Sequence, residues 1–195
     1  MPFLNSARSS EKWKRMSWTD SKTEWDEFVR MLSPGPGEKI LDVGAGKGTA
    51  AGRVLDVSKG ALVYAVDPNE KRVTKMQTGF PMLRASVAGA ERLPFADSDF
   101  DKAYTVMAMH HYGDIDRALG EIARVLKHGG TFVILEMEPG SLMGRVFRFF
   151  GRIGGEHMTV MREDQLLSKL KARDDFRVSN STKLGAKYLV QLTRV

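Results

Sequence analysis

Cysteine is absent from the 195 residues, which excludes disulfides, thiolate metal sites and cysteine nucleophiles. The chain also lacks an apolar run of about 18 residues, the length that a membrane-spanning helix needs. Its first residues, MPFLNSARSSEKWKRMSW, lack the continuous apolar core of a secretory signal. A chain of this length suits one domain with a substantial core, and we expect a cytoplasmic protein.

Acidic residues are scarce only in the C-terminal third. The net charge is +6, and residues 139–195 hold 11 Lys and Arg against 5 Asp and Glu, whereas the rest of the chain is balanced. Such an excess accompanies an anionic ligand, a nucleic acid or a membrane surface, and equally a basic face in contact with water alone. The charge by itself leaves these alternatives open.

Helical and strand patterns alternate along the chain. Helices are predicted at residues 20–32, 47–57, 69–78, 114–127 and 162–173, the fourth with Asp114 as N-cap and with His128-Gly129-Gly130 ending it. Strands are predicted at 38–44, 61–67, 81–87, 100–109, 131–137, 178–184 and 187–195. This order predicts an α/β fold: a doubly wound, Rossmann-like, mostly parallel seven-stranded sheet with helices on both faces and an antiparallel edge hairpin.

The stretch LDVGAGKGTA (41–50) follows the first predicted strand, where ligands bind in such sheets. A phosphate loop requires a glycine five residues before Gly46 and a hydroxyl after Lys47, and the chain has Leu41 and Gly48 there. A dinucleotide turn requires a third glycine at the position of Thr49. The phosphate loop is therefore excluded and the dinucleotide turn is weakened.

The pattern that is present, D-x-G-x-G-x-G, begins with a carboxylate. Glycines let the backbone pass close to a ligand, and the carboxylate of Asp42 can organise the turn and complement a positive charge. With this turn, the chain resembles the class I S-adenosylmethionine-dependent methyltransferases. It is most similar to the small-molecule branch that includes the ubiquinone and menaquinone biosynthesis enzymes.

The resemblance spans about residues 35–138 and is carried by four segments in order. These are the glycine turn, YAVDPNE (64–70), AGAERLPFADSDFD (88–101), and TVMAMHHYGD (105–114) with EIARVLKHGGTFVILE (121–136). Two positions depart from the family pattern: Gly89 stands where an Asp is usual, and His128 where a Pro is usual. Gly89 removes the side chain that would accept the adenine amine.

The resemblance implies a site for S-adenosyl-L-methionine, with S-adenosyl-L-homocysteine as the product. The turn would hold the amino acid end of the donor, Asp67 both ribose hydroxyls, and Pro68 one side of the adenine. The cofactor-binding residues implied are Asp42, Gly44, Ala45, Gly46, Gly48, Asp67, Pro68, Gly89, Ala90, Glu91 and Met107. No metal site is expected.

Methyl transfer from a sulfonium needs mainly positioning and exclusion of water, and a base where the acceptor must lose a proton. His110 and His111 follow the fourth strand, where the methyl group should emerge, and either could be catalytic or structural. Glu136 and Glu138 end the fifth strand and have the appearance of a carboxylate pair. Ordinary polar residues at a strand end are the simpler interpretation.

Two absences narrow the acceptor. The Asp/Asn-Pro-Pro-Phe/Tyr motif of methylases acting on nucleic acid bases is missing from TVMAMHHY, and without cysteine the covalent cytosine mechanism is excluded. The remaining acceptors are small molecules or lipids, with nucleic acid disfavoured.

We expect a single methyltransferase domain with four parts: an N-terminal helical cap (1–34), a cofactor-binding core (35–138), a lid-like insertion (139–161), and a C-terminal helix and strand pair (162–195). Trp13, Trp18 and Trp25 in the first part and residues 140–155 in the third would enclose an apolar or anionic acceptor. Arg145, Arg148 and Arg152 share one face of a predicted amphipathic helix, which is typical of a lid, of peripheral membrane contact or of a partner interface.

Two further classes stay open at this point. One is a regulatory protein that binds S-adenosylmethionine or S-adenosylhomocysteine without catalysis. The other is a nucleotide-dependent oxidoreductase.

Overall fold

The computed structural model describes residues 22–141, 144 and 159–195. Its helices are α1 (Lys22–Leu32), α2 (Thr49–Ser58), α3 (Glu70–Gly79), the 3-10 turn η3 (Met109–His111), α4 (Ile115–Val125) and α6 (Glu163–Lys171). Its strands are β1 (Lys39–Val43), β2 (Leu62–Asp67), β3 (Arg84–Val87), β4 (Phe100–Val106), β5 (Leu126–Met137), β6 (Phe176–Leu184) and β7 (Lys187–Arg194).

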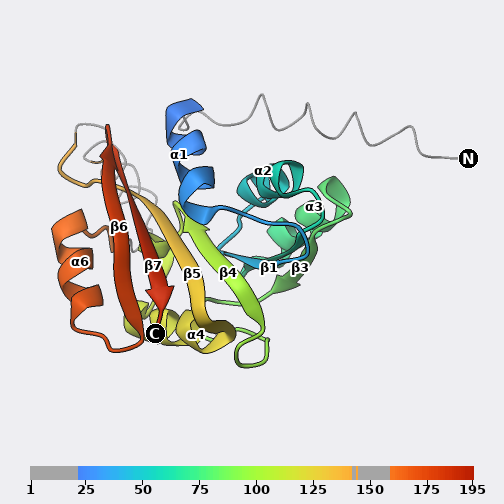
Figure 1. Cartoon of the computed structure of the whole chain (residues 1–195). Coiled ribbons are helices and arrows are strands. Elements are labelled where there is room, and N and C mark those ends of the chain that lie inside the picture. Colours follow the sequence, from blue (N-terminus) through green and yellow to red (C-terminus); the bar gives the residue numbers. More distant parts are fainter. Residues whose placement is uncertain (1–21, 142–143, 145–158) are drawn as a thin grey trace, which may run out of the picture.

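The strands form one sheet in the order β3-β2-β1-β4-β5-β7-β6 (Figure 1). The first five strands in this order, β3 to β5, are parallel to one another, whereas β7 runs antiparallel to its neighbours β5 and β6. The chain turns from β6 to β7 at Gly185, which has a φ of 61°. The predicted fold class is therefore confirmed, including the antiparallel pair at one edge.

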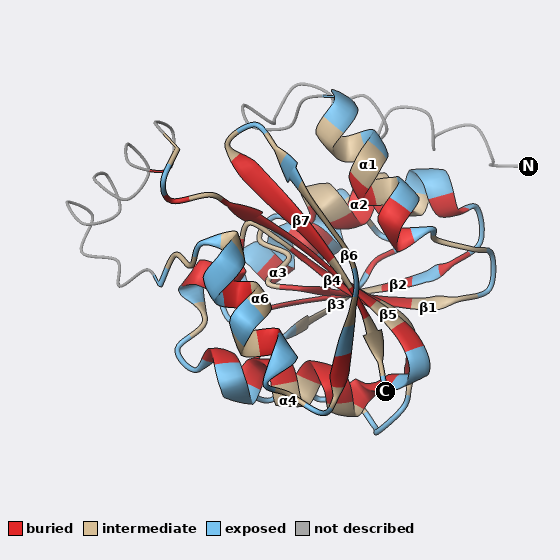
Figure 2. Cartoon of the chain, turned by 60° about the vertical axis from the view of Figure 1, so that its left-hand side comes forward, coloured by how far each residue is buried: buried red, intermediate tan, exposed pale blue. Residues whose placement is uncertain are grey.

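A hydrophobic core lies on each face of the sheet (Figure 2). One core joins the strands to α4 and α6, and the other joins them to α1, α2 and α3. Successive strand residues alternate between the cores: Phe132 and Ile134 belong to the first, Val133 and Leu135 to the second. Because both faces of the sheet are covered, inner strands such as β1 and β5 bury continuous stretches, which explains the continuous apolar runs in the sequence, whereas the edge strands β3 and β6 are more polar.

The helix starts follow local capping chemistry. The Asp114 side chain accepts a hydrogen bond from Arg117 N at 3.0 Å, as predicted for the start of α4. Asn69 caps α3 in the same way, accepting from Arg72 N at 3.2 Å. The cap on α3 places its first turn directly after the carboxyl end of β2, whereas α4 begins after the 3-10 turn η3 that follows β4.

The predicted boundary between α4 and β5 was wrong. The helix ends at Val125 and not at residue 127, and the strand begins at Leu126, before the glycine pair expected to separate them. The pairing of β4 with β5 shifts register between Phe100 and Lys102, so the His-Gly-Gly segment forms an irregular part of the strand. A Cβ on Gly130 would lie 2.8 Å from Lys127 O, so this close backbone approach requires a glycine.

Within residues 22–141 and 159–195, no helix has the length and apolar character needed to cross a membrane.

The order of the strands creates a switch point beside β1. β1 lies between β2 and β4, so the connections from β1 and from β4 leave toward opposite faces of the sheet. Such a switch point opens a crevice at the carboxyl ends of the strands.

Candidate active site

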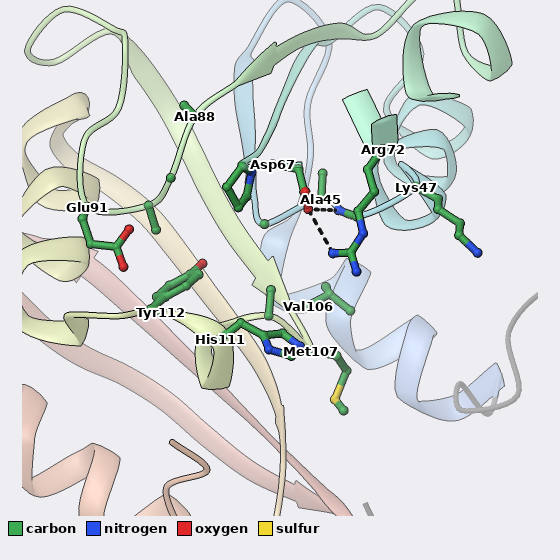
Figure 3. Close-up of a pocket in the computed structure, with 16 residues that line it drawn as sticks. Ala45, Lys47, Asp67, Arg72, Ala88, Glu91, Val106, Met107, His111 and Tyr112 are labelled. Atoms are coloured by element: carbon green, nitrogen blue, oxygen red, sulfur yellow. Dashed lines mark hydrogen bonds and ion pairs between the residues drawn. The ribbon is translucent and has the colours of Figure 1, made fainter. Parts of the chain in front are cut away.

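A cavity of about 450 Å³ lies in this crevice (Figure 3). Four segments line it, each following the carboxyl end of a strand. The lining residues are Gly44, Ala45, Gly46 and Lys47 after β1; Asp67, Pro68 and Arg72 after β2; Ala88, Gly89, Ala90 and Glu91 after β3; and Val106, Met107, Ala108, His111 and Tyr112 at the end of β4. Its volume falls within the range of about 300–1,000 Å³ common for small-molecule sites.

The glycine turn owes its spacing to backbone geometry. Gly44, Gly46 and Gly48 have backbone φ angles of 81°, 59° and 80°, values that residues with a side chain rarely adopt. A Cβ on Gly44 would lie 2.6 Å from Ala108 Cβ, and one on Gly48 would lie 2.8 Å from Met76 Cγ. Beside Gly46 there is open space. The first and third glycines let neighbouring elements approach, and the second leaves the cavity unobstructed.

Asp42 lies beneath the turn and is not among the residues that line the cavity. Its side chain is buried, and this burial raises the pKa of the carboxyl to about 8, against a smaller lowering by the Tyr104 hydroxyl and a backbone contact with Ala51. Asp42 is thus placed outside the cavity lining, and its predicted contact with the donor stays a prediction. The alternative role, organising the turn, fits this position.

Asp67 connects the second segment to the glycine turn. Its carboxylate accepts hydrogen bonds from Asn69 N at Oδ1 and from Gly46 N at Oδ2, both at 2.9 Å. Arg72 Nη1 lies 3.6 Å from the same Oδ2. The side chain of Asp67 is only 3% exposed, yet it borders the cavity, as predicted for a ribose-binding carboxylate.

The third segment is held by Glu91. Its Oε1 accepts a hydrogen bond from Gly113 N at 2.7 Å, which joins the loop after β3 to the loop after β4. A Cβ on Gly89 would lie 3.0 Å from Glu91 Oε2. The glycine that departs from the family pattern thus leaves its space to the carboxylate of Glu91.

The two predicted histidines occupy different environments. His111 is exposed and lines the cavity, whereas His110 is buried, with Nδ1 2.9 Å from Glu136 Oε1. Their ring centroids are 4.2 Å apart. Glu136 is 1% exposed and also accepts a hydrogen bond from Met137 N. Of the pair, only His111 faces the cavity.

Glu136 and Glu138 do not form a carboxylate pair. Glu136 binds His110 in the core, whereas Glu138 Oε2 accepts from Glu163 N at 3.4 Å, at the start of α6. They serve different structural contacts, in agreement with the simpler interpretation of their pattern.

Six residues that line the cavity were missed from the sequence: the apolar Ala88, Val106 and Ala108, and Lys47, Arg72 and Tyr112, which carry polar groups. Tyr112 donates a hydrogen bond to Val43 O and lies 2.9 Å from Thr105 Oγ1, and burial raises the pKa of its hydroxyl. Arg72 faces Asp67, and Lys47 borders the cavity with its side chain directed away from Asp67 (Figure 3). The sequence could have indicated Tyr112, because it directly follows the two histidines. It gave no indication of Arg72, which lies on an exposed helix face.

The acceptor-enclosing segments are only partly described. Trp13, Trp18, Arg145, Arg148 and Arg152 lie outside the described residues. Trp25 stacks on Phe28, with ring centroids 4.9 Å apart, and lies under the Arg53 guanidinium; it does not line the cavity.

Comparison with known proteins agrees with this geometry. Residues 41–134 match a family described as "Methyltransferase domain". The chain is 36% identical over 121 residues to the ubiquinone/menaquinone biosynthesis C-methyltransferase of Rubrivivax gelatinosus, covering 62% of this chain and 47% of that protein. It is 38% identical over 117 residues to the demethylmenaquinone methyltransferase of Corynebacterium kroppenstedtii, covering 58% and 48%. The chain thus spans about half the length of the curated relatives it matches.

Solved structures share the fold. Geranyl diphosphate C-methyltransferase from Streptomyces coelicolor, crystallised with Mg²⁺, geranyl diphosphate and S-adenosyl-L-homocysteine, has a TM-score of 0.74 at 14% identity, covering 89% of this chain and 79% of that one. A cyclase structure has a TM-score of 0.68 at 24% identity, covering 81% and 57%.

Fold and site together define a Rossmann-like methyltransferase domain. Residues 41–134 of the chain carry a methyltransferase domain, and the chain is similar to S-adenosylmethionine-dependent methyltransferases, whose cofactor is S-adenosyl-L-methionine. Its relatives include enzymes of quinone biosynthesis. They give no support to a non-catalytic binding protein.

Proposed function

We propose that this chain transfers a methyl group from S-adenosyl-L-methionine to a small-molecule acceptor by in-line displacement. The observation that carries the proposal is the hydrogen bond between Gly46 N and Asp67: a turn with glycine at every second position meets a buried carboxylate that borders the cavity. Such a carboxylate suits a vicinal diol, and the open turn suits a close-fitting amino acid group.

The donor would extend along the four segments. Its amino acid end lies over Gly44, Ala45 and Gly46, its ribose at Asp67, and its adenine between Pro68 and the loop 88–91, with Met107 as a further contact. This arrangement directs the sulfonium toward the end of β4. Gly48 and Asp42 support the turn from outside the cavity.

The reaction balances without a redox partner. A lone pair of the acceptor forms a bond to the methyl carbon while the carbon–sulfur bond breaks, and its electrons neutralise the sulfonium to give S-adenosyl-L-homocysteine. Where the acceptor carries a proton, His111 is the residue in the cavity that can accept it. His110 and Glu136 hold the histidine segment from below.

The acceptor class follows from the relatives and from charge. The names of the quinone biosynthesis and geranyl diphosphate methyltransferases indicate acceptors that are apolar or anionic small molecules. The basic C-terminal third of this chain suits an anionic acceptor or peripheral contact with an anionic membrane, and the missing Pro-Pro motif disfavours nucleic acid. A cytoplasmic location and the lid at 140–155 remain part of the proposal.

Ligand-induced stabilisation tests the proposal. S-adenosylmethionine and S-adenosylhomocysteine should raise the Tm, and NAD should not, because only a ligand that binds the folded state stabilises it. Stabilisation by NAD alone would instead favour the oxidoreductase, and donor binding with no turnover on any acceptor tried would favour a binding protein.

The Asp67→Ala variant locates the ribose. Losing two charge-assisted hydrogen bonds of about 1.5–3 kcal/mol each should weaken S-adenosylhomocysteine binding by at least 100-fold. Calorimetry measures this directly. Asp56→Ala, on α2 and absent from the cavity lining, is the control for removing one carboxylate. Unchanged affinity in Asp67→Ala would show that the ribose lies elsewhere.

A further inference from the structure

The protein's backbone N–H groups occupy only half of the hydrogen-bond acceptor sites on the carboxylate of Asp67. A carboxylate has about four lone-pair sites, two on each oxygen. Asn69 N occupies one on Oδ1 and Gly46 N one on Oδ2, each at 2.9 Å. One site therefore remains on each oxygen, which matches the two hydroxyls of a ribose.

Arg72 covers one of these remaining sites. Its Nη1 lies 3.6 Å from Asp67 Oδ2, and its guanidinium lines the cavity (Figure 3). The backbone of Arg72 is fixed in the first turn of α3, where its N–H donates to Asn69 Oδ1 and Asn69 O. The helix start therefore places Arg72 beside the cavity, which its side chain lines.

The contact between Arg72 and Asp67 is easy to exchange. Its length exceeds the 2.7–3.2 Å of a good N–H···O bond, and the side chain of Arg72 is 49% exposed. A half-exposed ion pair contributes little stability, because water solvates the guanidinium once it leaves. A hydroxyl that binds a carboxylate forms a shorter and stronger bond at about 2.5–2.7 Å.

We propose that Arg72 is an internal competitor of the donor: in the donor-free protein it occupies the site on Asp67 that one ribose hydroxyl must take. This inference rests on the proposed placement of the ribose at Asp67. Binding then exchanges the guanidinium for the diol, and the affinity for the donor and for its product is lower than the cavity alone would allow. Arg72 thereby tunes how readily the product leaves.

Removing the guanidinium should tighten binding. Arg72→Met keeps the length of the side chain and its helix propensity but loses the charge and the hydrogen-bond donors. We expect the Kd for S-adenosylhomocysteine, measured by calorimetry, to fall by about two- to fivefold, the range of an exposed ion pair. Lys71→Met is the matched control, because Lys71 is exposed on the same helix turn and does not line the cavity. Its Kd should match that of the parent.

The gain should depend on the diol. In competition assays, Arg72→Met should bind adenosine more tightly than the parent does, but should bind 2′,3′-dideoxyadenosine equally well, since that ligand does not claim Asp67. Weaker or unchanged S-adenosylhomocysteine binding in Arg72→Met would overturn the proposal, as would an equal gain for both nucleosides. If Asp67→Ala still binds S-adenosylhomocysteine as the parent does, the proposed ribose site itself fails, and this result is separate from any effect of Arg72.

Discussion

The two ends of the cavity are built in different ways. The donor end, after β1 and β2, consists of backbone: a glycine turn, helix starts and N–H groups that converge on Asp67. The other end, after β4, depends on side chains that pair across the sheet, such as His110 with Glu136. A backbone-built site leaves a short sequence pattern, whereas a site of paired side chains does not.

The largest expected effect is at the donor end. In Gly44→Ala the new Cβ would lie 2.6 Å from Ala108 Cβ at a φ of 81°, so strain and steric overlap together should lower the free energy of unfolding by about 2–4 kcal/mol and abolish donor binding. Denaturant unfolding and calorimetry measure both. Gly37→Ala has a similar φ of 78° but nothing within 4 Å, so it should cost only about 1 kcal/mol. Equal losses in the two variants would mean that steric contact plays no part.

At the acceptor end, two substitutions distinguish a structural role, that of Glu136, from a proposed catalytic role, that of His111. Glu136→Ala removes the buried carboxylate that contacts His110 and should lower the free energy of unfolding by about 1–3 kcal/mol, because a buried hydrogen bond is lost. His111→Ala should leave stability and donor affinity unchanged but reduce turnover on a proton-bearing acceptor by about 10²–10⁴-fold. Thermal unfolding and a single-turnover assay distinguish the two. If His111→Ala keeps full turnover, the base is not in the described cavity.

A pH-dependent effect concerns the carboxyl beneath the turn. Burial raises the pKa of Asp42 from 3.8 to about 8, so the folded protein holds a proton that the unfolded chain has released. Between about pH 4 and pH 8 this group therefore makes the protein less stable as the pH rises, by at most about 1.4 kcal/mol per pH unit. Asp42→Asn should remove this slope. Denaturant unfolding of both proteins at pH 5, 6.5 and 8 measures it, and parallel pH profiles would contradict the prediction.

Most of the fold could be predicted from the sequence. The strand and helix order, the parallel sheet and the antiparallel edge pair follow from periodicity and turn residues, and they are confirmed. The junction of α4 with β5 was misplaced, because the glycines at 129 and 130 match a helix end in sequence. Gly130 instead lets the backbones of β4 and β5 approach at a register shift, and Gly129 adopts a φ of 78° beside it.

The family and its cofactor were also identifiable, because four backbone-built segments keep a fixed order along the chain. The individual site residues remain predictions. Ten of the thirteen border the cavity, and Asp42 and Gly48 support its turn; His110 is the exception, since it faces the core.

The sequence by itself determined where the chain turns, which faces it buries and which class of ligand suits its glycine turn, since each depends on neighbouring residues. Only the tertiary structure decided which histidine faces the cavity, that Glu136 supports the other one, and that Arg72 faces Asp67. These relations join residues that are far apart in sequence or that lie on an exposed helix face. Local pattern carries no information on them, because side-chain direction and partner are set by packing between elements.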